Sequence, residues 1–559
     1  MSSLRIGGIA SGFDTDQIVY DLMRIERLKA DKLYQNRQVM EWQKEQFREI
    51  TNKVRSFRDT YFNLLRPETN LMSAFSLKRM QAISSNTEIV EVTAGADALI
   101  GETTFQVIQS ATKAEAQAGG ITGGSDEGKR LNLDDTMEVI SEKLAAAIEG
   151  GAEEKGLKFN ENNDFTFTLT INGESIVVNK KDSLRAVLSK INNSEAGVQA
   201  HYSTFSDTLT ITAKETGAGS ITTDDGGNFF SAFGFNLNEN DGTGNYTIGE
   251  AGKDAKFKIN GFEGTRASNT FTIEGLTYTI NRHIDESDGS DPGVDSLVKI
   301  TVSLDVDGIY ETIEKFVNDY NTLIEEINAK LDEKLHRDFS PLTDEQKEEM
   351  KDKEIEKWEE KAQSGLLRRD PLLQNMLLEM RQALYESVGE GKHHLTEIGI
   401  MTSNDYRDKG KLVLLEGGRA LKAAIAENPD KIVELFTCKP AIDYSPDLAA
   451  ADRAQRYKEA GLAHRLSDIL NDNIRTTRDN SGRKGILLER AGIEGDLSEI
   501  NNFYDRKILE VNKSIDRVNE MLWRKEEQLY RQFTAMEKAL QQLYAQGDWL
   551  MMQMSQWNS

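Results

Sequence analysis

Large apolar residues recur every seven positions near both ends of the chain. In the first stretch they are Leu33, Met40, Phe47, Val54 and Tyr61, joined by Ile50 and Phe57. In the second they are Ile508, Ile515, Leu522, Leu529, Met536 and Leu543, joined by Val511 and Val518. Side chains at this spacing form one narrow stripe along a helix. The sequence therefore predicts two long coiled-coil helices whose stripes pair with each other or with copies of themselves.

The first helix has a clear predicted start. Asp14 is followed three residues later by Gln17, a pair that resembles a capping box, and the Gly-rich segment GGIASGF precedes it. We expect this helix to run as far as Arg66, because Pro67 would stop it.

Between the two stripes the apolar period changes from seven to two, which indicates strands. FTFTLTI (165–171) is followed by Asn172-Gly173 and ESIVV, a strong hairpin signal. A short helix, SLRAVLSKI, and two further strands, VQAHY and TLTITA, complete a predicted ββαββ-like unit. Residues 256–261 and 269–280 repeat the hairpin pattern around Asn260-Gly261 and predict a second β-domain.

Helical spacing returns at Ile309, and a highly charged helix or linker is expected at 344–362, anchored by Trp358. The fold class is therefore α+β and multidomain, with terminal coiled-coil helices and a helical bundle enclosing two inserted β-rich domains. The predicted parts are a terminal leg (1–45 and 505–559), a helical bundle (46–77 and 305–504), a β-rich domain (78–125 and 251–304) and an outer ββαββ-like domain (126–250).

Charge is distributed unevenly along the chain. The net charge is −25, yet residues 14–66 hold 11 Lys and Arg against 9 Asp and Glu, and residues 500–545 hold 8 against 7. Residues 67–499 hold 48 against 76, a balance of −28. An acidic middle argues against nucleic acid and anionic membranes as partners, because both require basic surfaces. No apolar run approaches the roughly 20 residues of a membrane span.

Candidate chemistry is weak. Gly123–Lys129 has GxxxxGK spacing, but Arg130 stands where a phosphate loop needs Ser or Thr, so we interpret it as a surface turn. Acidic residues in the stretches 239–250 and 285–295 are interpreted as solvated loops rather than ion sites. The six His residues lack zinc-site spacing, and the lone Cys438 excludes an internal disulfide. We therefore predict no metal, no cofactor and no enzyme activity.

Several segments resemble one known family in its own order. GIASGFDTDQIVYDLMRIE (8–26), TFQVIQSATKAEAQ (104–117), LTINGESIVVNKKDSLRAVLSKINN (169–193) and EEQLYRQFTAMEKALQQLYAQGDWL are similar to flagellar hook-associated protein 2, the filament-capping family. The resemblance covers nearly the whole chain. The acidic insert around 340–365 is longer than the family leads us to expect.

The resemblance implies a cap at the tip of the bacterial flagellar filament, one that helps flagellin polymerise and stops its loss. It also implies a ring-shaped homo-oligomer, a pentamer, with flagellin and a flagellar export chaperone as partners. It further implies secretion through the flagellar type III pathway without a cleaved signal peptide, with which the polar N-terminus agrees. The stripe residues would then make the oligomer and filament contacts. An adhesin displayed on the flagellum and a hook–filament junction protein remain open alternatives.

Overall fold

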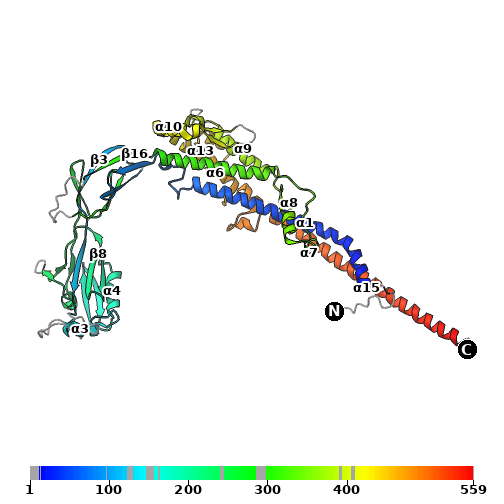
Figure 1. Cartoon of the computed structure of the whole chain (residues 1–559), viewed down its shortest axis with the longest axis horizontal. Helices are drawn as coiled ribbons and strands as arrows, with labels where there is room; N and C mark the ends of the chain where they lie inside the picture. The colour runs from blue at the N-terminus through cyan, green and yellow to red at the C-terminus, as the bar shows by residue number, and fades with distance from the viewer. Residues whose placement is uncertain are drawn as a thin grey trace. The chain divides into compact units, whose positions relative to one another are not determined.

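The chain forms two compact units, which are described separately. The computed structural model describes residues 12, 14–95, 97–122, 130–146, 156–161, 164–239, 244–284, 297–389, 393–403 and 410–557. The helical unit consists of residues 1–78 and 306–559, and the strand unit consists of residues 79–305 (Figure 1). The predicted α+β fold, with β-rich parts inserted between terminal helices, is confirmed.

The helical unit begins and ends with its two longest helices, α1 (Thr15–Tyr61) and α15 (Phe503–Trp557). Asp14 caps α1 as predicted, because its carboxylate accepts a hydrogen bond from the Gln17 amide at 3.0 Å. The helix ends at Tyr61, five residues before the predicted Arg66. The reason is a competing turn, in which the Tyr61 carbonyl accepts from Leu71 N and the Thr60 carbonyl accepts from Thr69 Oγ1.

Shorter helices pack against α1 or against one another and complete the bundle. They are α2 (Ala74–Leu77), α6 (Val306–Asp332), α7 (Asp344–Glu348), α8 (Asp352–Gln363), α9 (Pro371–Tyr385), α10 (Arg419–Glu427), α11 (Pro429–Thr437), α12 (Ala450–Glu459), α13 (Leu462–Ile474) and α14 (Ile486–Ala491). A small hairpin joins β17 (Ile400–Thr402) to β18 (Leu412–Leu414). Helix α1 contacts α6, α13 and α14. At its C-terminal end Phe57 and Tyr61 lie 5.8 and 5.3 Å from the ring of Phe316 on α6, so aromatic packing holds this end in the core.

One part of the strand unit, whose strands lie between residues 80 and 109 and between residues 255 and 304, is a two-sheet sandwich. Its strands are β1 (Met80–Ser84), β2 (Val90–Ala94), β3 (Gly101–Gln109), β12 (Ala255–Ile259), β13 (Phe262–Arg266), β14 (Thr270–Ile273), β15 (Leu276–Ile280) and β16 (Leu297–Leu304). One sheet has the order β1-β16-β3-β12-β13 and the other β14-β15-β2. Between them Phe105 stacks on Phe257 at 5.4 Å and on Tyr278 at 4.8 Å, in a core that both sheets share.

The outer part of the strand unit has its own core and also contains two sheets. Its elements are β4 (Lys113–Gly119), α3 (Met137–Ala146), β5 (Thr166–Ile171), β6 (Glu174–Asn179), α4 (Leu184–Asn193), β7 (Val198–Ser203), β8 (Thr208–Thr216), β9 (Ile221–Thr223), α5 (Phe229–Ala232), β10 (Leu237–Glu239) and β11 (Tyr246–Ile248). The predicted ββαββ order is present, but its hairpins belong to different sheets, β10-β11-β9-β5-β6 and β4-β8-β7.

Two predicted Asn-Gly turns form hairpins. Asn172 and Gly173 have φ angles of 51° and 84° and join β5 to β6, and Asn260 and Gly261, at 49° and 86°, join β12 to β13. Two consecutive positive φ angles are what a two-residue hairpin loop requires. The division of each unit into two domains with the boundaries stated above stays a prediction.

We predict that Phe105→Ala lowers the free energy of unfolding of the strand unit by about 3–5 kcal/mol, because it removes a fully buried ring. Phe262→Ala on neighbouring strand β13 removes a ring that is 81% exposed and should change it by less than about 0.5 kcal/mol. Amide exchange of the slowest protons of β3 and β16 would measure both. Equal effects would contradict the assignment of the core.

Candidate functional site: the paired terminal helices

Helices α1 and α15 lie side by side and run in opposite directions (Figure 1). Four polar contacts set their register: Lys44 with Asp505, Arg37 with Asn512, Tyr34 with Asn519, and Glu26 with Lys525. The first three contacts on α15 are seven residues apart, so they keep the heptad period. Lys525 Nζ lies 2.6 Å from the Glu26 carboxylate, and hydrogen bonds from Lys525 and Lys29 lower the Glu26 pKa. Exposed ion pairs of this kind add little stability, so apolar burial carries most of the pairing.

The stripe residues fall into three environments. Those buried inside the helical unit are Phe47, Ile50, Val54, Phe57, Tyr61 and Ile515. Those partly covered along the helix pair are Leu33, Met40, Ile508, Val511, Val518, Leu522 and Leu529. Met536 and Leu543 are 38% and 61% exposed. The buried group is already packed within one chain. A role for the stripe in oligomer or filament contacts stays a prediction.

Three buried residues that the sequence analysis did not identify extend the apolar stripe of α1 toward the N-terminus. Val19 and Met23 are each 1% exposed and Ala30 is 4% exposed. Val19 lies two heptads before Leu33, so continuing the repeat toward the N-terminus would have found it. Met23 and Ala30 lie one position beyond the second line of the stripe, because a straight helix drifts against a seven-residue repeat.

A second missed feature holds the start of α15 in place. The Arg490 guanidinium carbon lies 4.2 Å from the ring centroid of Phe503 and 5.1 Å from that of Tyr504, and Tyr504 in turn lies 5.9 Å from Phe47 on α1. A guanidinium over aromatic faces is favourable. Arg490 comes from α14, so this cluster joins three helices.

The loop before α15 is fixed by a partly buried ion pair. Lys484 Nζ contacts the Asp496 carboxylate at 2.5 Å, and that carboxylate also accepts from Ser498 N at 2.8 Å. Burial acts to raise the Asp496 pKa, but the Lys484 and Ser498 hydrogen bonds outweigh it and bring the pKa to about 2.

The acidic insert covers a further face of α1. Three glutamines of α1 donate side-chain hydrogen bonds to backbone carbonyls of this segment: Gln35 to Pro341 at 2.8 Å, Gln43 to Leu366 at 3.2 Å, and Gln46 to Gln363 at 2.9 Å. Trp358 anchors the insert as predicted, because its indole donates to the Ser340 carbonyl at 2.8 Å and its ring lies 4.6 Å from Phe339. Helix α1 is therefore held between α15 and the insert.

The last part of α15 presents a nearly uncharged apolar surface. Residues 538–557 contain only Lys538 and Asp548 as charged residues. The large apolar side chains that are at least 55% exposed there are Leu543, Tyr544, Trp549, Leu550, Met551, Met552 and Met554. A concentration of exposed aromatic and methionine side chains is typical of interaction surfaces. None of the helices in the described ranges is long and apolar enough to cross a membrane.

Comparison with known families decides the relationship of this chain. The C-terminal model of flagellar hook-associated protein 2 matches residues 252–545, and the N-terminal model matches residues 11–114. The first match alone covers more than half of the 559 residues. The chain belongs to the flagellar hook-associated protein 2 family.

Relatives in this family match over almost their whole length. The flagellar hook-associated protein 2 of Halalkalibacterium halodurans is 29% identical and that of Thermotoga maritima 23% identical, covering 97% and 98% of this chain and 98% and 96% of their own. The crystal structure of the D1-D2-D3 domains of the flagellar cap protein from Escherichia coli has a TM-score of 0.50 and 18% identity. It covers 79% of this chain and 97% of its own length, and it supports the fold.

The stretches weighed as ligand sites in the sequence lie largely outside the part of the chain that the structure describes. Residues 123–129 and 285–296, and residues 240–243 of the third stretch, lie outside the described residues. Across the described ranges, no group of three or more His, Cys, Asp or Glu side chains could hold a metal ion.

We predict that Gln35→Ala, Gln43→Ala and Gln46→Ala together loosen the middle of α1. Three lost hydrogen bonds at about 1 kcal/mol each should lower its local opening free energy by about 2–4 kcal/mol. Amide exchange across residues 27–46 would then quicken at least tenfold. Gln38→Ala, on the same helix, is the control and should leave exchange unchanged; equal effects would contradict the role of the insert.

We also predict acid sensitivity from Asp496. Its folded pKa of about 2 lies below the ordinary 3.8, so its stabilisation is present above pH 4 and is lost as pH falls toward 2. Asp496→Asn should lower stability at pH 7 by about 1–2 kcal/mol and flatten the decline of the melting temperature of the helical unit between pH 4 and 2. A variant with an unchanged pH profile would refute this assignment.

Proposed function

We propose that this protein is the cap at the distal tip of a bacterial flagellar filament, where it promotes flagellin polymerisation and prevents loss of monomer. Membership of the hook-associated protein 2 family carries this proposal, because the relatives match from end to end and share its order of segments. The adhesin and the hook–filament junction protein have no comparable support.

We assign each proposed role to one part of the chain, and each part is inserted within the part before it. Residues 1–45 and 505–559 form the leg, 46–77 and 305–504 the bundle, and 78–125 with 251–304 and 126–250 the two plate domains. The separate cores of the two β-rich parts support this division.

Within the leg, the exposed end of α15 is the surface that we assign to partners. Met536 and Leu543 belong to the heptad stripe and have no cover comparable to that of Phe47 or Val54. Flagellin at the growing end, sister subunits in a ring of five, and an export chaperone before secretion are the proposed partners. A methionine-rich face suits several partners in turn, because unbranched thioether side chains adapt to different surfaces.

The proposal assigns the chain a structural role without a catalytic step, in keeping with relatives that are named for their place in the flagellum. It places the protein outside the cell at the filament tip, exported by the flagellar type III pathway.

The test is a strain that lacks the gene, complemented with defined variants. Without the protein, monomeric flagellin should accumulate in the medium and filaments should be absent or short. The full chain should reverse both effects, and gold-labelled antibody should mark only filament tips. Trp549→Ser with Leu550→Ser should fail to complement, whereas Gln546→Ser on the same exposed helix should succeed. Normal filaments in the strain lacking the gene, or label along the shaft, would refute the cap.

A further inference from the structure

The loop of residues 439–449, here named the strap, joins α11 to α12 and contacts α13. Through Tyr444, Ser445 and Leu448 it forms one wall of a cavity of about 280 Å³. Residues in or next to helices α9, α12 and α13 line the rest of this cavity. Movement of the strap would therefore open the cavity to solvent.

Two arginines of α12 fasten the backbone of the strap. Arg453 donates to the Pro446 carbonyl at 2.7 Å and to the Leu448 carbonyl at 3.2 Å. Arg456 donates to the Ile442 carbonyl. Hydrogen bonds from a charged donor are stronger than those between neutral groups. The closed position of the strap therefore depends on where these two guanidinium groups are held.

Two carboxylates of α13 hold the arginines in place. Asp468 accepts two hydrogen bonds from Arg456, at 2.5 and 2.9 Å. Asp472 accepts from Arg453 at 2.9 Å and from the Tyr444 hydroxyl of the strap at 2.7 Å. The closed strap is thus bonded to α13 both directly and through α12.

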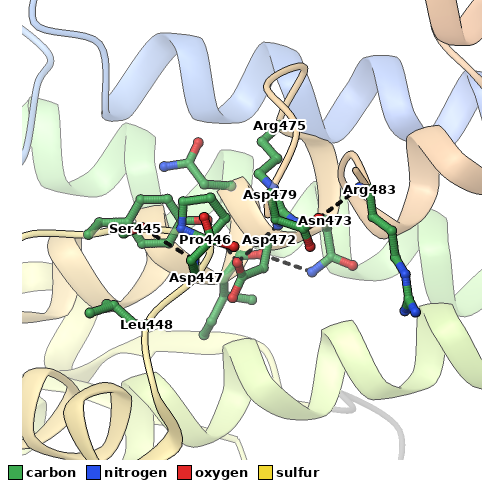
Figure 2. Close-up of polar contacts among 12 residues, drawn as sticks. Ser445, Pro446, Asp447, Leu448, Asp472, Asn473, Arg475, Asp479 and Arg483 are labelled. Atoms are coloured by element: carbon green, nitrogen blue, oxygen red, sulfur yellow. Dashed lines mark hydrogen bonds and ion pairs between the residues drawn. The ribbon is translucent and has the colours of Figure 1, made fainter. Parts of the chain in front are cut away.

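The end of the strap nearest α12 is also fixed to the segment that follows α13. Figure 2 shows the loop Ser445–Leu448 beside Asp472 of α13. Asp447 accepts from the Asn480 amide at 2.7 Å, and Asp472 accepts a further bond from Arg475 at 3.3 Å. Each carboxylate at this end has a donor, so the charges here favour the closed strap.

The end nearest α11 contains a histidine in a place that is unfavourable for positive charge. His464 lies in the first turn of α13, whose N-cap is Gly461. A helix N-terminus carries a partial positive charge, which disfavours an imidazolium there. Burial, then the charges of Arg456 and Lys439, lower the pKa of His464, and a hydrogen bond to the Thr437 backbone opposes them only in part.

The surrounding elements supply no free negative charge to this ring. Helix α12 contributes Arg456 and the strap contributes Lys439. Asp468, one turn further along α13, is already bonded twice to Arg456. Burial raises the pKa of Asp468, so its own titration favours the closed strap and does not account for release in acid.

The direction of the pH effect follows from the two states of His464. In the closed strap the pKa of the ring lies below the ordinary 6.5. In an open strap the ring is hydrated and Lys439 has moved away, so it takes up a proton near pH 6.5. Closure is therefore complete above that pH and weakens below it, by about tenfold per pH unit until the closed ring titrates.

We propose that the strap is released by mild acid, with His464 as the group that takes up the proton. Protonation adds a positive charge beside Arg456 and Lys439, and movement of the strap separates Lys439 from the ring. Release begins at the end nearest α11, where Lys439 lies, and opens the cavity behind the strap. At neutral pH the bonds from Arg453 and Arg456 keep the strap closed.

Amide exchange of residues 439–449 in the full chain, corrected for intrinsic exchange rates, tests the proposal at about pH 7.5 and about pH 5.5. In the parent we expect opening to be about tenfold more frequent at the lower pH. His464→Gln retains a donor for the Thr437 backbone but does not titrate, so this increase should disappear. His201→Gln, at an exposed position of β7, is the control and should keep it.

A second pair of variants leaves the histidine in place. Lys439 is exposed, so Lys439→Gln should fold normally and should make the acid-induced increase smaller than in the parent. Lys458→Gln makes the same charge change at an exposed position of α12 and should behave like the parent.

The half-buried thiol of Cys438, next to the strap, gives an independent measurement. Its rate of reaction with dithiodipyridine, relative to glutathione at the same pH, should rise in parallel with amide exchange. An unchanged exchange rate in the parent, or an equal increase in His464→Gln, would overturn the proposal. None of these outcomes depends on whether the protein caps a filament.

Discussion

The architecture depends on antiparallel pairing between the chain segments that enter and leave each folded part. The segment that enters an inserted part pairs with the segment that leaves it. One folded part can therefore be inserted within another along the chain. At the ends, α1 pairs with α15 through contacts such as Glu26 with Lys525. Within the strand unit, β1 pairs with β16, with Met80 opposite Leu304, and Arg79 forms an ion pair with Asp305 at 2.5 Å.

The same device recurs where the outer β-rich part begins. Thr112 lies opposite Lys253 and Glu115 opposite Glu250 as antiparallel bridges, so the outgoing and returning segments again share hydrogen bonds. Pairing at each level satisfies backbone groups that would otherwise be exposed or orphaned. It also brings together residues more than 100 positions apart, and the hydrogen bonds formed there offset part of the loop-closure entropy that each insertion costs.

Two strand edges in the outer β-rich part are partly covered by side chains. Lys190 donates to the Val177 carbonyl of edge strand β6, and the Asn192 side chain bonds both the amide and the carbonyl of Ala200 on edge strand β7. Both residues come from α4. Unpaired edges would otherwise template association between copies. These side-chain hydrogen bonds occupy backbone groups on β6 and β7 that could otherwise pair with another strand.

The features that could be predicted from the sequence depend on local signals. Those that could not be predicted depend on packing between elements that are distant in the sequence. Asn172-Gly173 specifies its turn by itself, and Asp14 caps its helix within one turn, so both could be predicted. The heptad stripe predicts two long helices, but one period serves two surroundings. Val54 faces the bundle, whereas Leu543 faces solvent. Nothing in the repeat separates them, because the difference lies in which distant helices return to cover each stretch.

The contacts of the insert could not be predicted from periodicity. Gln35, Gln43 and Gln46 have the polarity of any exposed helix face until carbonyls of the insert meet them more than 300 residues later. A charged residue on a helix is ordinarily solvated and uninformative. Its role becomes clear only from the partners that the folded chain places around it.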